Sequence, residues 1–185
     1  NMRGVAFLGN SVAEVIDFPD VNPGPEQVLV KLRSSGLCGS DFSRYRGSSP
    51  NEHEGQLMRP GHEPCGEVVA LGLNVKGLKV GDRIIQHHYE GCHQCEYCLT
   101  GWQQLCEVTE KKLYYGGSMH GGHGDYMIAH ESTCITLPDQ VDYEVGAYLA
   151  CGASTAFQAL KKLNISGRDV LAVFGQGPVG LAATM

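Results

Sequence analysis

The sequence predicts a β-rich domain up to about residue 150, followed by the opening of an α/β domain that the chain does not complete. Three observations support this fold class. Residues 3 to 137 consist of short apolar segments separated by glycine, proline and acidic turns. After Pro138 the apolar residues recur every three or four positions, which is the period of a helix. A continuous apolar run from Asp169 to Phe174 then leads into a glycine-rich turn, which is typical of a parallel strand covered on both faces.

The β-rich part begins with two strands at 4–8 and 12–18, which we expect to form a hairpin followed by proline-containing turns at 19–20 and 22–25. The third strand alternates clearly, with Val28 and Val30 on one face and Lys31 and Arg33 on the other. Four further strands are expected, at 66–71, 82–87, 126–129 and 134–137.

The C-terminal part is predicted to contain a helix over 142–163, with an interruption at Gly152, then a strand over 169–174 and a new helix. Asn1 before Met2 is typical of a residue left by tag removal, so we expect the natural start at Met2. The chain stops at Met185 within the first turns of that helix, so we expect a truncated domain.

Composition excludes several classes of function. The 185 residues suffice for one well-buried core and part of a second. Acidic residues number 20 against 14 basic ones, which argues against a non-specific nucleic-acid binder or a basic membrane-surface protein. No apolar stretch approaches the ~20 residues of a membrane span, and the N-terminus lacks a secretion-signal pattern. The 25 glycines predict many turns and close backbone approaches.

Four of the eight cysteines fall in the pattern Cys92-x2-Cys95-x2-Cys98-x7-Cys106. Without a signal peptide, such cysteines indicate metal binding in a reducing compartment, here the cytoplasm. Four thiolates on an irregular loop can close a tetrahedral shell around a structural zinc ion. An iron–sulfur cluster is less suited, because its usual motif ends in a three-residue gap followed by proline. A redox dithiol is the other alternative.

A second set of metal-binding residue types lies at predicted strand ends. Cys38 follows the third strand, and His62 and Glu63 open a later one. A thiol, an imidazole and a carboxylate suit an open catalytic zinc site. Spacing alone leaves simpler alternatives open: Cys38 as a small buried hydrophobic residue and His62 as a hydrogen-bonded turn residue.

Four motifs occur in an order and at separations that match a known family. They are Gly36-Leu-Cys-Gly-Ser-Asp41, the pattern Gly61-His-Glu-x2-Gly66-x5-Gly72, the four-cysteine segment and Gly175-x-Gly177-x2-Gly180. The glycine motif alone is a weak signal, but it lies between a predicted strand and a predicted helix, where the backbone can approach a pyrophosphate. With these motifs, which span essentially the whole chain, the sequence resembles the zinc-containing alcohol dehydrogenases of the medium-chain dehydrogenase/reductase family.

The resemblance implies a mainly β, GroES-like catalytic domain with short helices over residues 2–150, with a structural zinc lobe at about 90–110. Residues 151–185 then correspond to a linking helix and the first strand–helix unit of a truncated Rossmann nucleotide-binding domain. The ligands of the structural zinc are expected to be Cys92, Cys95, Cys98 and Cys106.

For the catalytic zinc, the resemblance implies Cys38, His62 and Cys151 as ligands, with Glu63 able to ligate when substrate is absent. Asp41 corresponds to the carboxylate that orients His62. Two further groups of residues are carried over: Ser40 as the hydroxyl that accepts the substrate proton, and a cofactor-binding set of Thr155, Gly175, Gly177, Pro178, Val179 and Gly180.

The sequence also departs from the family pattern. Ser43 stands where many relatives have a proton-relaying histidine, and Gly39 replaces a residue that is often basic and touches the cofactor. His88 is expected to face the substrate pocket, and its neighbour His87 to point away, because adjacent residues on a strand alternate. His120 and His123 could line the entrance of the pocket, but we expect them to be solvated loop residues. Cys65 and Cys134 are expected to be packing residues without a chemical role.

The function implied for the whole protein is the interconversion of an alcohol and an aldehyde or ketone, with hydride transfer to or from NAD or NADP and two zinc ions per chain. The expected partner is a small-molecule alcohol or carbonyl compound, with no nucleic acid or membrane, and the full-length form is expected to be a homo-oligomer. The residue that separates NAD from NADP would lie ~20 positions beyond the glycine motif, past Met185. Two alternatives remain: that the 185-residue chain is a non-catalytic zinc-binding domain, and that it is a thiol redox protein.

Overall fold

The computed structural model describes residues 1–185, which form short strands and helices joined by long turns. The strands are β1 (Met2–Gly9), β2 (Val12–Phe18), β3 (Gln27–Gly36), β4 (Glu52–His53), β5 (Gln56–Leu57), β6 (Glu63–Leu71), β7 (Arg83–Gln86), β8 (Tyr89–Glu90), β9 (Leu113–Tyr114), β10 (Tyr126–His130) and β11 (Cys134–Thr136). The helices are α1 (Gly39–Arg46), α2 (Glu96–Leu99), α3 (Tyr143–Tyr148), α4 (Ser154–Leu163) and α5 (Pro178–Thr184). None of these helices has the length and apolarity that crossing a membrane requires.

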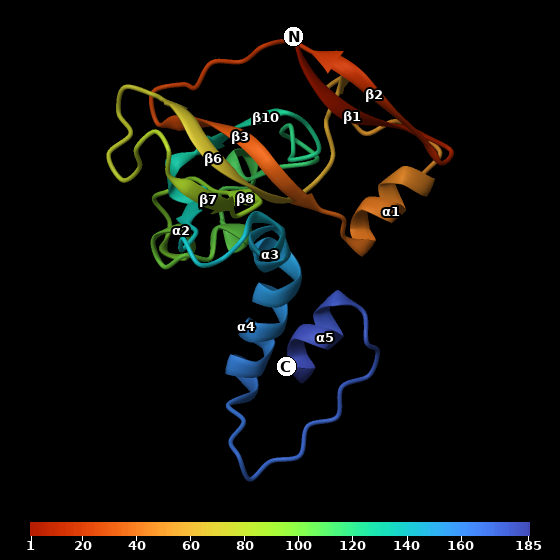
Figure 1. Cartoon of the computed structure of the whole chain (residues 1–185), viewed down its shortest axis with the longest axis vertical. Helices are drawn as coiled ribbons and strands as arrows, with labels where there is room; N and C mark the ends of the chain where they lie inside the picture. The colour runs from red at the N-terminus through yellow and green to blue at the C-terminus, as the bar shows by residue number, and fades with distance from the viewer.

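The centre of the molecule is an antiparallel five-stranded sheet in the order β10-β3-β6-β7-β11 (Figure 1). The alternation expected in the third strand is confirmed, because Val28 and Val30 are fully buried. They pack with Val68, Ile84 and Met127 in the largest apolar cluster. Burial of such a side chain contributes roughly 1.5–3 kcal/mol, so this cluster supplies much of the stability of the sheet.

The first two strands form the expected hairpin, which lies beside the central sheet (Figure 1). Its own small core contains Met2, Ala6 and Phe18. The hairpin is joined to the segment that precedes β10 by Arg3, whose guanidinium lies 3.2 Å from the Asp125 carboxylate. The two sheets are therefore held together by polar contacts as well as by apolar packing.

The predicted helix over 142–163 is present, but it changes its hydrogen-bonding pattern partway along. α3 is followed by a π-turn over Leu149–Ala153 and then by α4, so the chain continues through Gly152 without a break. A third apolar cluster of Cys65, Leu137 and Ala147 holds α3 against the sheet. Figure 1 shows α4 extending away from the sheets, with α5 packed beside it.

The strand predicted over 169–174 is absent, and this correction has a clear physical cause. A parallel strand needs a neighbour to accept its backbone hydrogen bonds, and the described chain contains no strand beside this segment. Val170 is 100% exposed and Phe174 96% exposed, so the apolar run has nothing to pack against. The segment is therefore irregular, although its composition is that of a buried strand.

Several short elements have no counterpart in the sequence prediction. α1 follows β3 directly, and the two-residue strands β8 and β9 pair with each other across the cysteine lobe. Strands of two residues are too short to show a period in the sequence. Their pairing also depends on residues more than twenty positions apart. These short elements matter for function because they position the candidate metal-binding residues described next.

Candidate metal centres

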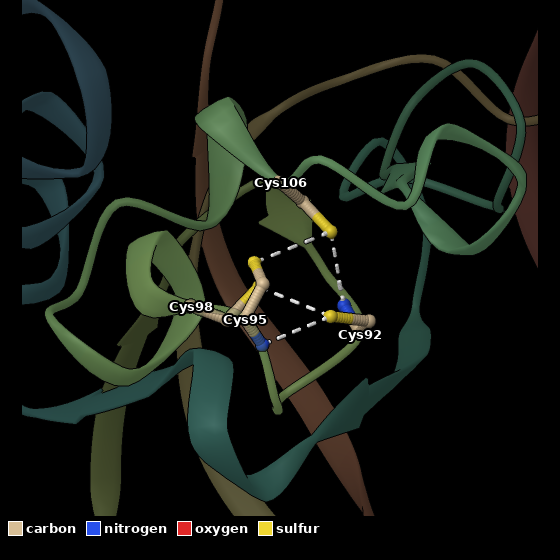
Figure 2. Close-up of side chains that lie close together, drawn as sticks. All are labelled: Cys92, Cys95, Cys98 and Cys106. Carbon is tan, nitrogen blue, oxygen red and sulfur yellow. Dashed lines mark hydrogen bonds between the residues drawn. The ribbon is translucent and has the colours of Figure 1, made fainter.

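The four cysteines of the lobe converge around one point. Figure 2 shows Cys92, Cys95, Cys98 and Cys106 with their sulfurs turned toward one another. The Sγ atoms of Cys92 and Cys98 are 4.0 Å apart, as are those of Cys95 and Cys106. Tetrahedral ligands at ~2.3 Å from zinc would be about 3.8 Å apart. The four donors therefore fit a closed zinc shell with little movement.

The lobe favours the thiolate form of Cys92, whereas burial raises the pKa of Cys98 to about 12. Hydrogen bonds from the backbone N–H groups of Gln94 and Cys95 lower the pKa of Cys92 to about 6. Two backbone N–H groups donate hydrogen bonds of 3.3 Å to sulfur, one from Cys95 to Cys92 Sγ and one from Cys92 to Cys106 Sγ. Such donors stabilise negative charge on sulfur, which supports the assignment of these cysteines as metal ligands.

The second constellation is also brought together by the fold. Cys38 precedes the first turn of α1, His62 and Glu63 lie at the start of β6, and Cys151 lies in the π-turn. One ligand atom from each of these residues lies within 4.8 Å of the others. Residues more than a hundred positions apart in the sequence thus form one cluster of two thiols, an imidazole and a carboxylate.

The cluster depends on close packing between β3 and β6. Gly36 pairs with Glu63 across these strands. A Cβ at Gly36 would come within 2.1 Å of Glu63 Oε2. The glycine in the Gly36-Leu-Cys38 motif therefore makes room for the carboxylate beside the ligand Cys38. π-turns frequently occur at functional sites, and this one directs Cys151 toward the same cluster.

Asp41 contacts both Cys38 and His62, which come from different segments of the chain. Its Oδ2 accepts a hydrogen bond of 3.0 Å from the backbone N–H of Cys38, and its Oδ1 lies 3.6 Å from His62 Nδ1. Asp41 is 2% exposed. Burial opposes its ionisation, but the contacts with His62 and Cys38 leave its pKa below the ordinary value. An ionised carboxylate at Nδ1 orients the ring so that Nε2 is the nitrogen available to a metal.

The electrostatics of the metal-free cluster suit cation binding. Burial alone would lower the pKa of His62, but the Asp41 carboxylate and the neighbouring thiols raise it to about 10. Burial raises the pKa of Glu63. For Cys38, burial is outweighed by hydrogen bonds to Ser40 and by His62, so its pKa is lowered. A proton on His62 therefore balances the negative charge of the acidic donors. A zinc ion can take the place of that proton and bind this donor set.

Two clefts meet at Cys151. The first, with a volume of about 770 Å³, is lined by His87, His88, Trp102, Cys151 and Thr155 among others. The second, of about 750 Å³, is lined by Cys38, Glu63, Cys151 and the glycine motif at 175–180. Ser40 is exposed on the first turn of α1, two residues after Cys38. Two ligands approaching from different sides could thus reach the same cluster.

The glycine motif has the local geometry of a close turn. Gly175 has a φ of +92°, a conformation that favours glycine. A Cβ on Gly180 would come within 2.0 Å of the Gly175 carbonyl oxygen, so the first turn of α5 packs directly on the turn. This role matches that of the third glycine in dinucleotide-binding motifs, where it allows close packing of the helix.

The prediction that His88 faces the substrate pocket while His87 points away needs correction. His87 and His88 both line the first cleft, because β7 ends at Gln86 and strand alternation does not extend to them. The His88 ring lies 5.0 Å from that of His62, and burial together with the charge on His62 lowers the pKa of His88 to about 3.

His120 and His123 are not solvated loop residues. His120 Nδ1 accepts a hydrogen bond of 3.2 Å from the Arg59 backbone, and the His123 side chain is only 11% exposed. His123 Nδ1 lies 2.8 Å from Ser35 Oγ, and its Nε2 lies 3.9 Å from Asp41 Oδ2. The sequence showed no signal for this placement, because the burial of His123 depends on a long-range contact of its glycine-rich loop.

Tyr114 is a further neighbour of the cluster that sequence reasoning missed. Its ring lies 6.0 Å from the His62 ring and 5.6 Å from the His88 ring, and burial raises its pKa to about 12.

The two cysteines expected to be packing residues are placed as predicted: Cys65 is fully buried and Cys134 packs against the main core.

Comparison with known proteins agrees with this architecture. The family described as "Alcohol dehydrogenase GroES-like domain" matches residues 24–139. The zinc-type alcohol dehydrogenase-like protein YphC of Escherichia coli, itself uncharacterised, is 40% identical over 97% of this chain and 53% of its own length. A sorbitol dehydrogenase of Halalkalibacterium halodurans is 37% identical over 89% of this chain and 46% of its own length.

Solved structures give the same result. Acetophenone reductase from Geotrichum candidum in complex with NAD has a TM-score of 0.86 at 32% identity, and the match covers 98% of this chain and 53% of that one. A cobalt- and zinc-bound alcohol dehydrogenase from Pyrobaculum aerophilum has a TM-score of 0.82 at 28% identity, covering 98% and 55%. The chain therefore spans about half the length of the relatives that it matches. By its sequence and its fold, the chain belongs to the zinc-type alcohol dehydrogenases of the medium-chain dehydrogenase/reductase family, and carries their GroES-like domain.

Proposed function

We propose that the protein to which this chain belongs is a zinc-dependent oxidoreductase that interconverts an alcohol and an aldehyde or ketone with NAD or NADP. The observation that carries this proposal is the convergence of Cys38, His62 and Cys151 where two clefts meet. One cleft would admit the substrate, and the other would admit the nicotinamide end of the cofactor.

The proposed catalytic ligands are Cys38, His62 and Cys151, with Glu63 as a further donor when substrate is absent. The donor types and their mutual distances, all within 4.8 Å, support this assignment. A zinc ion held there would act as a Lewis acid toward the substrate oxygen. A second zinc, held by Cys92, Cys95, Cys98 and Cys106, would have a structural role only, because four thiolates leave no open position.

The residues around the cluster would orient the reactants and handle the proton. Ser40 would accept the proton of an alcohol, and its exposure on the first turn of α1, two residues after Cys38, supports this role. Asp41 would hold the His62 ring in position, as its contacts with both ligand segments suggest. Position 43 is an exposed serine and not a histidine, so beyond Ser40 the proton would pass through water, Ser43 or another histidine.

The cofactor would bind in the cleft that contains the glycine motif. Gly175, Gly177, Pro178, Val179 and Gly180 line this cleft beside Cys38 and Cys151. We assign the pyrophosphate to this motif and the nicotinamide to the neighbourhood of Thr155, which lines the adjoining cleft. The cofactor itself supplies the hydride chemistry. The complex of acetophenone reductase with NAD supports the use of a nicotinamide cofactor by this fold.

The same proposal assigns the division of the chain. Residues 2–150 would form the catalytic domain, and residues 151–185 would begin a Rossmann domain. The exposure of Val170 and Phe174 supports this division, since a completed domain would cover them.

We further propose a small alcohol or carbonyl compound as substrate, a homo-oligomeric whole protein, and a cytoplasmic location. The eight unpaired cysteines support the last of these.

One alternative function is favoured by a specific observation. The chain covers about half of the length of its relatives. The 185-residue chain on its own would then be a zinc-binding domain without turnover. Activity of the isolated chain toward an alcohol would exclude this alternative.

The test is the zinc content per chain, measured by elemental mass spectrometry after dialysis, for the unchanged chain and for Cys151→Ala. We expect two zinc ions in the former and one in the latter. Cys134→Ala is the matched control, because Cys134 packs against the core outside both clusters, and it should retain both ions. Full zinc content and full turnover of the full-length enzyme with Cys151→Ala would contradict the ligand assignment.

A further inference from the structure

A third group of metal-binding side chains lies beside the cysteine lobe and belongs to neither proposed zinc centre. Glu90, His93 and His130 place a carboxylate oxygen and two imidazole nitrogens within 4.8 Å of one another. Glu90 and His93 flank the lobe residue Cys92, whereas His130 ends strand β10. The group therefore forms only when the lobe folds against the central sheet.

The two histidines are held in parallel and point the same way. Their rings stack with centroids 4.2 Å apart and planes 15° apart. Both Nδ1 atoms face Ser132 Oγ, at 2.9 Å for His130 and 3.3 Å for His93. Both Nε2 atoms face carboxylates instead. His93 Nε2 lies 3.6 Å from Glu90 Oε1, and His130 Nε2 lies 3.5 Å from Glu26 Oε2.

These separations fit a shared ion better than they fit hydrogen bonds. Hydrogen bonds between nitrogen and oxygen measure about 2.7–3.2 Å, so both nitrogen–carboxylate distances are too long. Two tetrahedral ligands at about 2.1 Å from a zinc ion would be separated by about 3.4 Å. Within the group, the 3.6 Å between His93 Nε2 and Glu90 Oε1 is close to that value, and the donor atom of His130 lies within 4.8 Å of both.

The outer contacts of the group are those that metal ligands require. Tyr115 donates a hydrogen bond of 2.5 Å to Glu90 Oε2, which leaves Oε1 to face His93. Ser132 Oγ can accept a hydrogen bond from His130 Nδ1–H, which leaves the lone pair of Nε2 free. In the other tautomer Nδ1 accepts from the Ser132 backbone N–H, and Nε2–H faces Glu26. Metal binding would thus select the tautomer of His130 that carries its proton on Nδ1.

Charge and burial point to the same conclusion. The group opens into a cleft of about 380 Å³, whose charged lining residues include Glu26, Glu90 and Glu110 against Lys111. Three carboxylates against one ammonium group favour a cation. Side-chain exposure falls from 66% at Glu26 to 33% at His93, 15% at His130 and 11% at Glu90, so two of the three inner donors are largely shielded from water.

We propose that Glu90, His93 and His130 form a third metal site, with Glu26 as an outer carboxylate, and that it takes a divalent transition-metal ion of the zinc class. Because it has no thiolate ligand, it binds the ion more weakly than the two cysteine-containing centres and loses it on dialysis, while those centres keep their zinc. Two imidazoles and a carboxylate are a ligand set that zinc, cobalt and nickel accept. An ion there connects the cysteine lobe to the end of β10 and the start of β3. The site is independent of the proposed catalytic centre.

The test is a titration of the full zinc-loaded chain with Co²⁺, followed by absorption spectroscopy. Cobalt on nitrogen and oxygen ligands gives weak visible bands, whereas cobalt on thiolates adds sulfur-to-metal charge transfer. We expect one further equivalent to bind, without charge-transfer bands and with both zinc ions retained. His130→Asn should abolish binding of this further equivalent of Co²⁺, because asparagine lacks Nε2. The variant should still fold, since asparagine can accept the hydrogen bond from the Ser132 N–H. His93→Asn should do the same, since asparagine tolerates the φ of +60° found there.

The matched control is His53→Asn, an exposed histidine outside the group, which should bind cobalt as the unchanged chain does. Glu26→Gln provides a variant that does not threaten folding, because Glu26 lies at the surface, and it should weaken cobalt binding by about tenfold. Failure of the unchanged chain to bind a further equivalent would overturn the proposal. Equal cobalt binding by the unchanged chain and His130→Asn, or charge-transfer bands showing entry into a cysteine site, would also overturn it.

Discussion

Asp41 shows how one buried side chain can organise a site that is assembled from distant segments. It accepts from the Cys38 backbone and faces His62 Nδ1, so it fixes both the start of α1 and the orientation of the imidazole. Its replacement should therefore affect metal binding more than folding. Asparagine keeps the acceptor for the Cys38 N–H but loses the negative charge at His62.

For Asp41→Asn we predict a metal affinity at the Cys38–His62–Cys151 cluster that is lower by about 10–100-fold, the usual cost of losing a carboxylate behind a ligating histidine. Competition with a zinc chelator measures this change. The cysteine lobe, which Asp41 does not contact, should keep its zinc. Asp139→Asn, which removes a carboxylate at a distant turn, should leave both affinities unchanged; an unchanged affinity in Asp41→Asn as well would show that the carboxylate does not support the ligand.

At the scale of single residues, the sequence anticipated the donors but not their surroundings. Residue types and spacing suggested Cys38 and His62, and the family resemblance added Cys151, which the fold brings to the same cluster. His123 and Tyr114 could not be found this way, because their approach to Asp41 and His62 depends on loops whose shapes are set by long-range contacts. His87 was misplaced because alternation was extended past the end of β7.

Among the elements, the cysteine lobe has the least apolar support. Of the residues between α2 and β9, few are buried, and none belongs to an apolar core cluster. We predict that removal of zinc with a chelator, or Cys98→Ser, opens this lobe while the central sheet stays folded, because a structural ion supplies the folding free energy of such segments.

Hydrogen exchange measures this outcome directly. Amides in α2 should lose protection, whereas those in β3, β6 and β10 should keep it. Cys134→Ser, outside the lobe, serves as the matched control and should leave the exchange of α2 unchanged. Uniform loss of protection across lobe and sheet would show that the two do not unfold separately.

The joint between the hairpin and the central sheet should depend on pH. The hydrogen bond from the Arg3 side chain lowers the pKa of Asp125 below its ordinary value of 3.8. A depressed folded pKa means that the stabilisation is present above about pH 4 and is lost as the pH falls through the folded pKa. We predict that Asp125→Asn removes this part of the acid sensitivity and makes the unfolding midpoint less dependent on pH between about 5 and 3. Thermal unfolding at several pH values measures the effect, which added salt should reduce because Arg3 is largely exposed.

Elements with their own periodic pattern were predicted well, and those that depend on a partner were not. The alternation in β3 and the helical period of 142–163 are local signals, and both elements are present. The run at 169–174 has a strand's composition but has no neighbouring strand, so it stays irregular. The π-turn at Leu149–Ala153 carries no signal in composition, because it differs from an α-helix only in the register of its hydrogen bonds.

For the whole molecule, stability resides in the sheet and not in the C-terminal extension. Residues 164–185 include no buried residue, and their apolar side chains at Val170 and Phe174 are exposed. Apolar surface that stays in water contributes nothing to folding. The contact of Tyr148 with the Pro178 carbonyl is one of the few links from this segment to the rest.

We therefore predict that a chain ending at Leu163 folds with a free energy of unfolding within about 1 kcal/mol of that of the 185-residue chain, which corresponds to a shift in Tm of less than about 4 °C. Calorimetry measures this shift, and elemental analysis should find the same zinc content, since every proposed ligand lies before residue 164. As a contrast, Met127→Ala should cost about 2–5 kcal/mol, because Met127 is fully buried in the main core. A large loss of stability on shortening the chain would mean that residues 164–185 support the β-rich part, and the proposed domain boundary at about residue 150 would then have to be withdrawn.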